Sequence, residues 1–310
     1  MNYIGFDTSN YTTSTAIYDG SSFISSRRLL DVKSGERGLR QSDALFQHVK
    51  RLPEVMDKLG QLPEISAVGV STRPRNADGS YMPVFLAGIS FAKTASSVLG
   101  VPLYEFSHQD GHIMAGICSC KAYELLSERF LSVHISGGTT ELLLTEYNGH
   151  SFDVEIVGGT KDISAGQVID RVGVRLGLGF PCGKELDSLY YEASNAPVLP
   201  VSCREGFFNF SGLETKTERI SASAPDLAKG VIDAILETLV RAIGFCIKSF
   251  EIHRVLLVGG VASNSVLRKK LPERLDADTY FAPPEMSSDN ACGIAALAAC
   301  AYERGEKGHV

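Results

Sequence analysis

Hydrophobic positions recur with two different periods along this chain, and each period predicts one class of secondary structure. Short runs of β-branched and apolar residues, such as 255–258, are typical of buried strands. Apolar residues spaced by three or four positions predict helices over 43–59, 84–99, 226–250 and 290–305. We expect Pro53 to interrupt the first of these helices, Gly100 to close the second, and Pro225 and Asp226 to start the third. This alternation of strands and helices indicates an α/β fold.

Two stretches, 4–23 and 133–152, align with one another at a constant offset of 129 positions. Each begins as a short strand, passes through a turn rich in Ser, Thr and Gly, and leaves as a second strand. Each then ends at Asp-Gly or Asn-Gly, which accept the positive φ angles of tight turns, so a third strand should follow. The matched positions are Tyr18 with Tyr147, Asp19 with Asn148, Gly20 with Gly149 and Phe23 with Phe152. The match favours two related halves, and the alternative is two ordinary hairpins.

The composition is that of a soluble globular protein, and the net charge bears on whether the chain wraps nucleic acid. The chain has 310 residues, of which 44% are hydrophobic and 21% charged, and its formal net charge is −6. This charge argues against wholesale wrapping of nucleic acid. Basic residues do gather at 27–40, 73–75 and 268–270, where a solvated surface is the plainer interpretation.

The chain shows neither a secretory signal nor an apolar run of the ~18 residues that a membrane span needs. Its seven cysteines are an odd number, which favours reduced thiols over a disulfide framework. We therefore expect a cytoplasmic protein without a membrane segment.

Two histidines, His108 and His112, offer the clearest candidate chemistry. On a helix this spacing places both imidazoles on one face, about one turn apart. Asp289 is either the N-cap of the last helix or a carboxylate that completes a metal site. Two histidines and one carboxylate suit Fe(II) or Zn(II), and the alternative is two polar residues on a wet surface. Cys118 and Cys120 would fall on opposite sides of a continued helix relative to His112, which favours core packing for both.

Glycine-rich turns beside carboxylates indicate a nucleotide site. The stretch 254–271 is a strand that runs into two glycines and then a helix from about Asn264, so a nucleotide could approach its backbone. Neither a P-loop nor a GxGxxG fingerprint is present. A plain strand–loop–helix connection, and a capping or surface role for each aspartate, are the alternatives. The candidates within 158–187 are the carboxylates of Asp162, Asp170 and Asp187 and the nearby glycines Gly166, Gly179 and Gly183.

Taken in order, several segments resemble the TsaD/Gcp family, the catalytic subunit that makes threonylcarbamoyladenosine in tRNA and was once described as an O-sialoglycoprotein endopeptidase. The likeness runs over nearly the whole chain, and several weak motifs in one order are far more specific than any one of them. The motifs are GFDTSNYTTSTAIYD (5–19), AGISFAKTASSVLGVPLYEFSHQDGH (87–112), HISGGTTELLL (134–144), DISAGQVIDRVGVRLGLGFPCG (162–183), FNFSGLET (208–215), GGVASNSVLRKKL (259–271) and SDNACGIAALA (288–298).

The resemblance implies a two-lobed actin/Hsp70-like (ASKHA) fold with duplicated RNase H-like lobes, which would account for the repeated hairpin. We expect an N-terminal lobe over 1–125, joined by the C-terminal helix 291–310, and a C-terminal lobe over 126–290. A cleft between the two lobes would hold a nucleotide and a metal.

The family's site residues carry over by position. One Fe2+ or Zn2+ per chain would be held by His108, His112 and Asp289. ATP or threonylcarbamoyl-AMP would be the bound nucleotide. Its phosphate and carbamoyl end would contact Ser136, Gly137 and Gly138, its ribose and adenine would contact Asp170, Gly183 and Asp187, and Asn264 would close the pocket.

The implied reaction is attack by N6 of adenosine-37 in tRNA on threonylcarbamoyl-AMP, with release of AMP. Partner proteins of the threonylcarbamoyladenosine complex would supply part of the RNA-binding surface that this acidic chain lacks. A homodimer, or a heterodimer with a paralogue, is a further expectation.

The chain departs from the family's motifs at several positions around the phosphate. Each departure removes a charged or histidine side chain or changes a turn. Thr139 replaces the histidine of SGGHT, Asn10, Tyr11 and Thr12 stand where ETSCDET has its acidic pair, Ile163 and Gln167 replace two acids of DDAAGEAFDK, and TRPRN at 72–76 replaces TRGPG.

Two hypotheses follow from this mixture of retained and lost residues. In the first, the chain is a metal-dependent transferase that acts on tRNA, or a carbamoyltransferase with another acceptor. In the second, it is a non-catalytic nucleotide-binding paralogue that pairs with the true subunit. The first hypothesis is favoured because the predicted metal ligands His108, His112 and Asp289 are retained. The second is favoured because charged and histidine residues around the phosphate are lost. A protease has no support, because neither HExxH nor a nucleophile–base motif is present.

Overall fold

The computed structural model describes residues 1–9, 11–32, 39–77, 79–283 and 290–308. The chain divides into two compact units, each with its own sheet. Unit 1 comprises Met1–Lys121, Tyr147–Asp153 and Glu285–Val310, and unit 2 comprises Ala122–Glu146 and Val154–Pro284. In the described part of the chain, no helix combines the length and apolar character that crossing a membrane requires.

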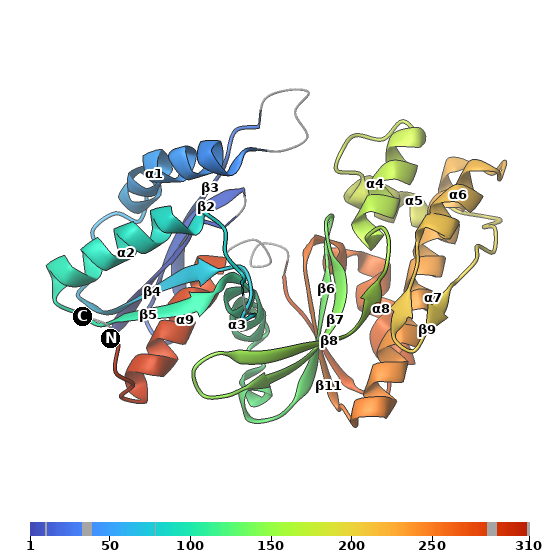
Figure 1. Cartoon of the computed structure of the whole chain (residues 1–310). Coiled ribbons are helices and arrows are strands. Elements are labelled where there is room, and N and C mark those ends of the chain that lie inside the picture. The colour runs from blue at the N-terminus through green and yellow to red at the C-terminus, as the bar shows by residue number, and fades with distance from the viewer. Residues whose placement is uncertain (10, 33–38, 78, 284–289, 309–310) are drawn as a thin grey trace. The chain divides into compact units, whose positions relative to one another are not determined.

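Unit 1 is a five-stranded sheet in the order β3-β2-β1-β4-β5 (Figure 1). β1 pairs with β2 and β2 with β3 in antiparallel fashion, whereas β1, β4 and β5 run parallel. The strands are β1 (Asn2–Asp7), β2 (Thr12–Tyr18), β3 (Phe23–Leu29), β4 (Ile65–Arg73) and β5 (Leu103–Ser107). The helices are α1 (Gln41–Asp57), α2 (Phe85–Leu99), α3 (His108–Cys120) and α9 (Asn290–Glu303).

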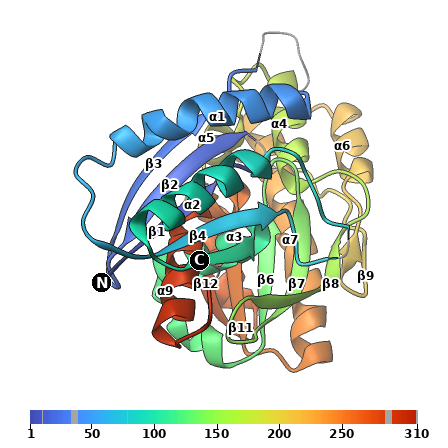
Figure 2. The same ribbon diagram turned by 60° about the vertical axis from the view of Figure 1, so that its left-hand side comes forward.

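Helices lie on both faces of this sheet (Figure 2). The alternation of side chains along β1 explains this arrangement. Ile4 and Phe6 point to one face, where they pack in a cluster with residues of α1 and α2. Gly5 points to the other face, and a Cβ there would lie 2.4 Å from the carbonyl oxygen of Ala291 in α9. The small-residue helix α9 therefore packs directly against the strand backbone.

Unit 2 is a seven-stranded sheet in the order β12-β11-β6-β7-β8-β10-β9. β6 runs parallel to β11 and antiparallel to β7. The strands are β6 (Phe130–Ile135), β7 (Thr140–Tyr147), β8 (Phe152–Thr160), β9 (Cys203–Arg204), β10 (Phe207–Phe208), β11 (Arg254–Val258) and β12 (Asp278–Phe281). The helices are α4 (Ala165–Arg175), α5 (Gly183–Tyr190), α6 (Ser211–Glu218), α7 (Ala224–Phe250) and α8 (Ser265–Arg274), with 3-10 turns η1 (Tyr123–Ser127) and η2 (Gly260–Ser263).

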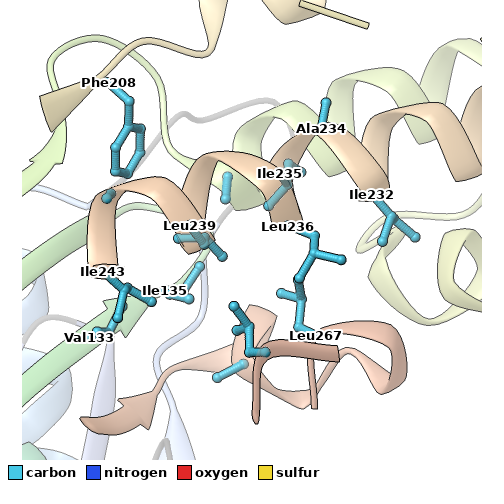
Figure 3. Packing of buried hydrophobic residues seen from close by; sticks show 14 of the residues in the cluster. Val133, Ile135, Phe208, Ile232, Ala234, Ile235, Leu236, Leu239, Ile243 and Leu267 are labelled. Atoms are coloured by element: carbon cyan, nitrogen blue, oxygen red, sulfur yellow. The ribbon is translucent and has the colours of Figure 1, made fainter. Parts of the chain in front are cut away.

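The core of unit 2 forms around α7, whose apolar face lies against the sheet (Figure 3). Ile235, Leu239 and Ile243 of α7 belong to one buried cluster with Val133 and Ile135 of β6. α7 starts two residues before Asp226, because the Ser223 hydroxyl accepts a hydrogen bond from the Asp226 N–H and Pro225 occupies the first turn.

Two further predicted helix boundaries can be compared with the structure. α2 ends at Gly100, which takes the left-handed conformation, as predicted. The predicted interruption at Pro53 was wrong, because α1 continues through Pro53 to Asp57. The carbonyl that loses its partner belongs to Val49, which lies on the exposed side of the helix and can bind water.

The repeated hairpin is present in both sheets, and its turns share detailed geometry. Each pair of strands is followed by a third, β3 or β8, as the sequence predicted. Gly20 and Gly149 have φ angles of +97° and +103°. The Tyr18 hydroxyl donates to the Gly20 carbonyl at 2.8 Å, and the Tyr147 hydroxyl donates to the Gly149 carbonyl at 2.7 Å. The same hydrogen bond at the same offset supports two related halves.

Candidate functional site

The two predicted histidines lie at the start of α3. Ser107 is the N-cap and forms a capping box with Asp110, so His108 is the first helical residue and His112 follows one turn later. The two imidazole ring centroids are 4.4 Å apart. The prediction that both rings share one face of a helix is therefore confirmed.

A buried carboxylate orients the first of these histidines. Oδ2 of Asp7, at the end of β1, lies 2.7 Å from Nδ1 of His108, and Oδ1 accepts hydrogen bonds from the amide and hydroxyl of Ser9. Burial by itself raises the pKa of Asp7, but the His108 imidazole and the Ser9 hydrogen bonds outweigh it, so this pKa lies below its usual range. A carboxylate on Nδ1 fixes the tautomer that leaves Nε2 as the ligand atom.

The Nε2 side of His108 faces two further polar side chains. Nε2 lies 3.3 Å from the Ser9 hydroxyl and 3.5 Å from the Asn290 side-chain amide. Oδ1 of Asn290 is buried and has no hydrogen-bond partner among the described residues. A neutral imidazole nitrogen beside an unsatisfied amide oxygen fits a divalent cation.

The third predicted ligand, Asp289, precedes Asn290 and lies outside the described residues. Within the part of the chain that is described, which omits 284–289, no group of three His, Cys, Asp or Glu side chains could hold a metal. The metal set of His108, His112 and Asp289 therefore stays a prediction.

Asp110 holds the start of α3 in place, and this buried carboxylate was missed by the sequence analysis. Oδ2 accepts hydrogen bonds from the amide and hydroxyl of Ser107, and both oxygens lie 2.9 Å from the side-chain amide of Asn76. Oδ1 also accepts from the Phe152 N–H at 3.1 Å. One fully buried carboxylate thus joins α3, the 72–76 turn and the 147–153 turn within unit 1.

In unit 2, the predicted phosphate loop 136–138 follows β6 and contacts the N-terminus of α4. The Ser164 hydroxyl donates to the Gly137 carbonyl at 2.8 Å. A Cβ on Gly166 would lie 2.6 Å from the Ser136 carbonyl oxygen, so glycine is required for this approach. A Cβ on Gly137 or Gly138 would meet no atom within 4 Å, so this side of the loop is open. A helix N-terminus beside an open loop can bind a phosphate.

The loop after β11 leaves the same edge of the sheet. β6 and β11 are parallel neighbours with His134 opposite Val258. Gly259 has a φ of +101°, and a Cβ there would lie 2.3 Å from the Ile135 carbonyl oxygen. Loops at the carboxyl ends of neighbouring parallel strands are the usual location of nucleotide sites in α/β folds.

The residues predicted to hold ribose and adenine, together with Asn264, which was predicted to close the pocket, fall into two pairs. Asp170 Oδ1 accepts from the Cys182 N–H at 2.9 Å, which holds Asp170 beside Gly183 at the start of α5. Asp187 Oδ1 accepts from the Asn264 side-chain amide at 3.0 Å, and its Oδ2 accepts from the Ser265 N–H at 2.9 Å.

Asn264 also has a structural role. It is the N-cap of α8, since its Oδ1 accepts from the N–H groups of Val266 and Leu267. The plain alternative, a capping role, thus applies to Asn264 itself.

The remaining aspartate of the glycine-rich segment, Asp162, caps α6. Its carboxylate accepts from the backbone N–H groups of Phe210 and Ser211 at the start of α6 and of Ile163. Burial by itself raises the pKa of Asp162, but these hydrogen bonds and that of the Ser211 side chain outweigh it and leave this pKa below its usual range. Asp162 therefore joins the 162–183 motif to the FNFSGLET motif.

Comparison with known proteins places this geometry in a family. The sequence pattern of TsaD, described as tRNA N6-adenosine threonylcarbamoyltransferase, matches residues 31–296. The chain belongs to the TsaD family. The sequence-based assignment to this family, and to its class of transferase enzymes, is therefore confirmed.

Relatives in the TsaD family match most or nearly all of the chain. A tRNA N6-adenosine threonylcarbamoyltransferase from Thermosipho africanus is 31% identical over 98% of this chain and 96% of its own length. A protein of the same name from Thermus thermophilus is 35% identical over 84% of this chain and 79% of its own length.

Solved structures confirm the predicted actin/Hsp70-like fold. HypF from T. kodakarensis has a TM-score of 0.63 at 13% identity, over 98% of this chain and 48% of its own. The activator of 2-hydroxyisocaproyl-CoA dehydratase from Clostridium difficile, solved with bound ADPNP, has a TM-score of 0.56 at 18% identity over 100% of this chain and 99% of its own.

Proposed function

We propose that this chain is a metal-dependent transferase that moves a threonylcarbamoyl group from threonylcarbamoyl-AMP to N6 of adenosine-37 in tRNA. The observation that carries the proposal is the orientation of His108 by the buried Asp7 carboxylate. A histidine on a wet surface does not need a carboxylate that is 1% exposed to select its tautomer, whereas a metal ligand does.

In this proposal unit 1 holds one Fe2+ or Zn2+ through His108, His112 and Asp289. When bound, the metal would polarise the carbonyl that is attacked and steady the adenylate phosphate. Asp7 keeps Nδ1 of His108 protonated, so that Nε2 faces the ligand position, and Asp110 fixes the helix start that presents both rings.

Unit 2 would bind the nucleotide, as ATP or as threonylcarbamoyl-AMP. The 136–138 loop and the N-terminus of α4 would contact the phosphate. Asp170, Gly183 and Asp187 would hold ribose and adenine, and Asn264 would close the pocket. The N6 amine then forms a bond to the carbamoyl carbon, the bond from that carbon to the AMP phosphate oxygen breaks, and N6 loses a proton. A phosphate at a helix N-terminus is stabilised as AMP leaves.

We propose that the chain acts with partner proteins of the threonylcarbamoyladenosine complex, because a chain with a net charge of −6 has no general electrostatic attraction for the polyanionic tRNA. A second copy of the chain, or a paralogue, is the proposed direct partner. Exposed apolar side chains on α1 and α2 support a protein contact on unit 1, since such residues gather where partners bind. They are Phe46, Val49, Leu86, Val98 and Leu99.

Metal content and transfer assays test the function directly. Protein purified without chelator or a histidine tag should contain about one iron or zinc per chain by elemental analysis. It should transfer radiolabelled threonylcarbamate from threonylcarbamoyl-AMP to tRNA in the presence of its partners, and chelation should stop this transfer. Nucleotide binding without metal, even after anaerobic reconstitution, would favour the non-catalytic paralogue. Metal and carbamoyl release without tRNA product would favour another acceptor.

Asp7→Asn should weaken metal binding about ten- to a hundredfold while the fold is kept. The amide can donate to Nδ1 of His108 and so favour the tautomer that withdraws the Nε2 lone pair from the metal. Competition with a chelator of known affinity measures the change. Asp19→Asn is the matched control, because Asp19 accepts its hydrogen bonds at an exposed turn of the same unit. Equal metal affinity in the two variants would contradict the orienting role of Asp7.

Asn264→Ala should weaken nucleotide binding and also lower the free energy of unfolding by about 1 kcal/mol, because α8 loses its N-cap. Calorimetric titration with ATP measures the first effect and urea unfolding the second. Asn264→Ser separates them, because serine can cap the helix but lacks the amide that reaches Asp187. Unchanged nucleotide affinity in both variants would show that the pocket has been misplaced.

A further inference from the structure

A charged, open cavity of about 870 Å³ lies in unit 2, between α7, α8 and the segment 194–201. One wall is apolar and contains Pro197, Val198 and Leu199, of which Val198 is 97% exposed. The other wall consists of side chains from one face of α7 and the facing side of α8. None of the residues predicted to bind metal or nucleotide lines this cavity.

The helical wall carries two carboxylates that are each shared by two cations. Asp233 lies 2.9 Å from Lys229 and 3.6 Å from Lys270. A cluster of one carboxylate and two cations carries one positive charge more than the carboxylate neutralises. The Tyr190 hydroxyl accepts hydrogen bonds from both ammonium groups, at 2.9 and 2.6 Å, and donates to Asp233.

The second cluster repeats the first one turn further along both helices. Glu237 lies 2.7 Å from Arg241 of α7 and 2.7 Å from Arg274 of α8. The Glu237 side chain is 29% exposed, whereas those of Arg241 and Arg274 are 55% and 40% exposed, so the guanidinium groups lie outermost. With Glu273, which also lines the cavity, four cations face three carboxylates.

The length of this row indicates the class of ligand. From position 229 to position 241 the row spans about 18 Å, at 1.5 Å per helical residue. A single phosphate would contact one cluster and leave the other unused, whereas a chain of phosphates can contact both. A local excess of positive charge on a chain whose net charge is −6 is also the feature expected of a binding site for a polyanion.

We propose that this cavity binds the phosphate backbone of the tRNA substrate. The proposal rests on the function proposed above and adds to it a site for the RNA on unit 2. Lys229 and Lys270 stay charged there, since hydrogen bonds to Tyr190 and the nearby Asp233 carboxylate raise the pKa of both side chains despite the burial that lowers it. The apolar wall would face the riboses and bases between the phosphates.

Three substitutions that change charge in opposite directions test the site in the full-length protein. Arg241→Gln and Arg274→Gln each leave Glu237 with one partner, and each should weaken tRNA binding about tenfold at 50 mM salt. The negative slope of the logarithm of affinity against the logarithm of salt concentration should become less steep by about 1 for each, and by about 2 in the double variant. Glu237→Gln should instead tighten binding. Arg129→Gln is the matched control, since Arg129 pairs with Glu146, its side chain is half-exposed, and it does not line the cavity.

The binding and transfer experiments distinguish failure of the proposed RNA site from failure of the proposed reaction. A double variant that is folded by circular dichroism but keeps the wild-type salt slope would overturn the proposal, as would a wild-type chain that fails to bind tRNA at 50 mM salt. Competition by inorganic tripolyphosphate at the concentration of tRNA phosphate would show a site for small anions and would also overturn it. If the arginine variants show a less steep salt dependence of tRNA binding but the wild-type protein transfers nothing to tRNA, the RNA site would be supported and the proposed reaction refuted.

Discussion

His112→Ala should remove the bound metal and abolish transfer to tRNA, while unit 1 stays folded. His112 lies one turn into α3 beside the His108 ring and is partly exposed, so its loss leaves the core around α9 intact. A site reduced from three protein ligands to two is not expected to retain the metal through purification. Elemental analysis should therefore fall from about one metal per chain to almost none.

His253→Ala is the matched control for this substitution. His253 is exposed between α7 and β11, and its removal should leave metal content and transfer unchanged. Urea unfolding of both variants should lie within about 1 kcal/mol of the wild type. Retained metal in His112→Ala would refute the assignment of the histidine pair as ligands, whatever the transfer assay shows.

Most elements of the fold could be predicted from the sequence, because local pattern decides them. α2, α7, α9 and β11 follow from apolar spacing and from residues such as Gly100, whose φ angle favours glycine. The repeated hairpin could be predicted because its turns depend on Gly20 and Gly149. The continuation of α1 through Pro53 could not, since it depends on which side of the helix faces the rest of unit 1.

The candidate site could be predicted only where its residues are close in sequence. The shared face of His108 and His112 follows from helical spacing. Asp7 was missed because its contact with His108 joins residues 101 positions apart, and in the sequence it is merely the end of a strand. Its signal was its place just before the first turn of the repeated hairpin. Asp110 was missed because an acid in the first turn of a helix has an ordinary capping role.

The structure also explains several departures from the TsaD motifs. Asn76, in the altered 72–76 turn, donates its side-chain amide to Asp110. Ile163 packs against the core of unit 2, and Gln167 accepts from the Ser164 N–H in the capping box of α4. Glutamate would serve the same capping role as Gln167. These departures are thus accommodated by local hydrogen bonds and packing, and Asn76 helps to hold the carboxylate that caps α3.

Asp110→Ala should lower the free energy of unfolding by about 4 kcal/mol, a large part of the roughly 5–15 kcal/mol typical of a domain. The substitution leaves the Ser107 amide and hydroxyl, the Asn76 amide and the Phe152 N–H without their buried acceptor. Urea unfolding measures the change. Asp153→Ala is the control, because Asp153 accepts one hydrogen bond at an exposed turn and should change stability by less than about 0.5 kcal/mol.

If Asp110→Ala does not fold, Asn76→Ala tests the same hydrogen-bond network with a smaller loss of stability. It removes one donor from the carboxylate and should cost about 2 kcal/mol. Metal affinity should fall in parallel with stability in both variants, because Asp110 fixes the first turn of α3, which carries His108 and leads to His112. A stable Asp110→Ala protein with wild-type metal affinity would mean that the histidine pair is held by the rest of α3 and not by this carboxylate.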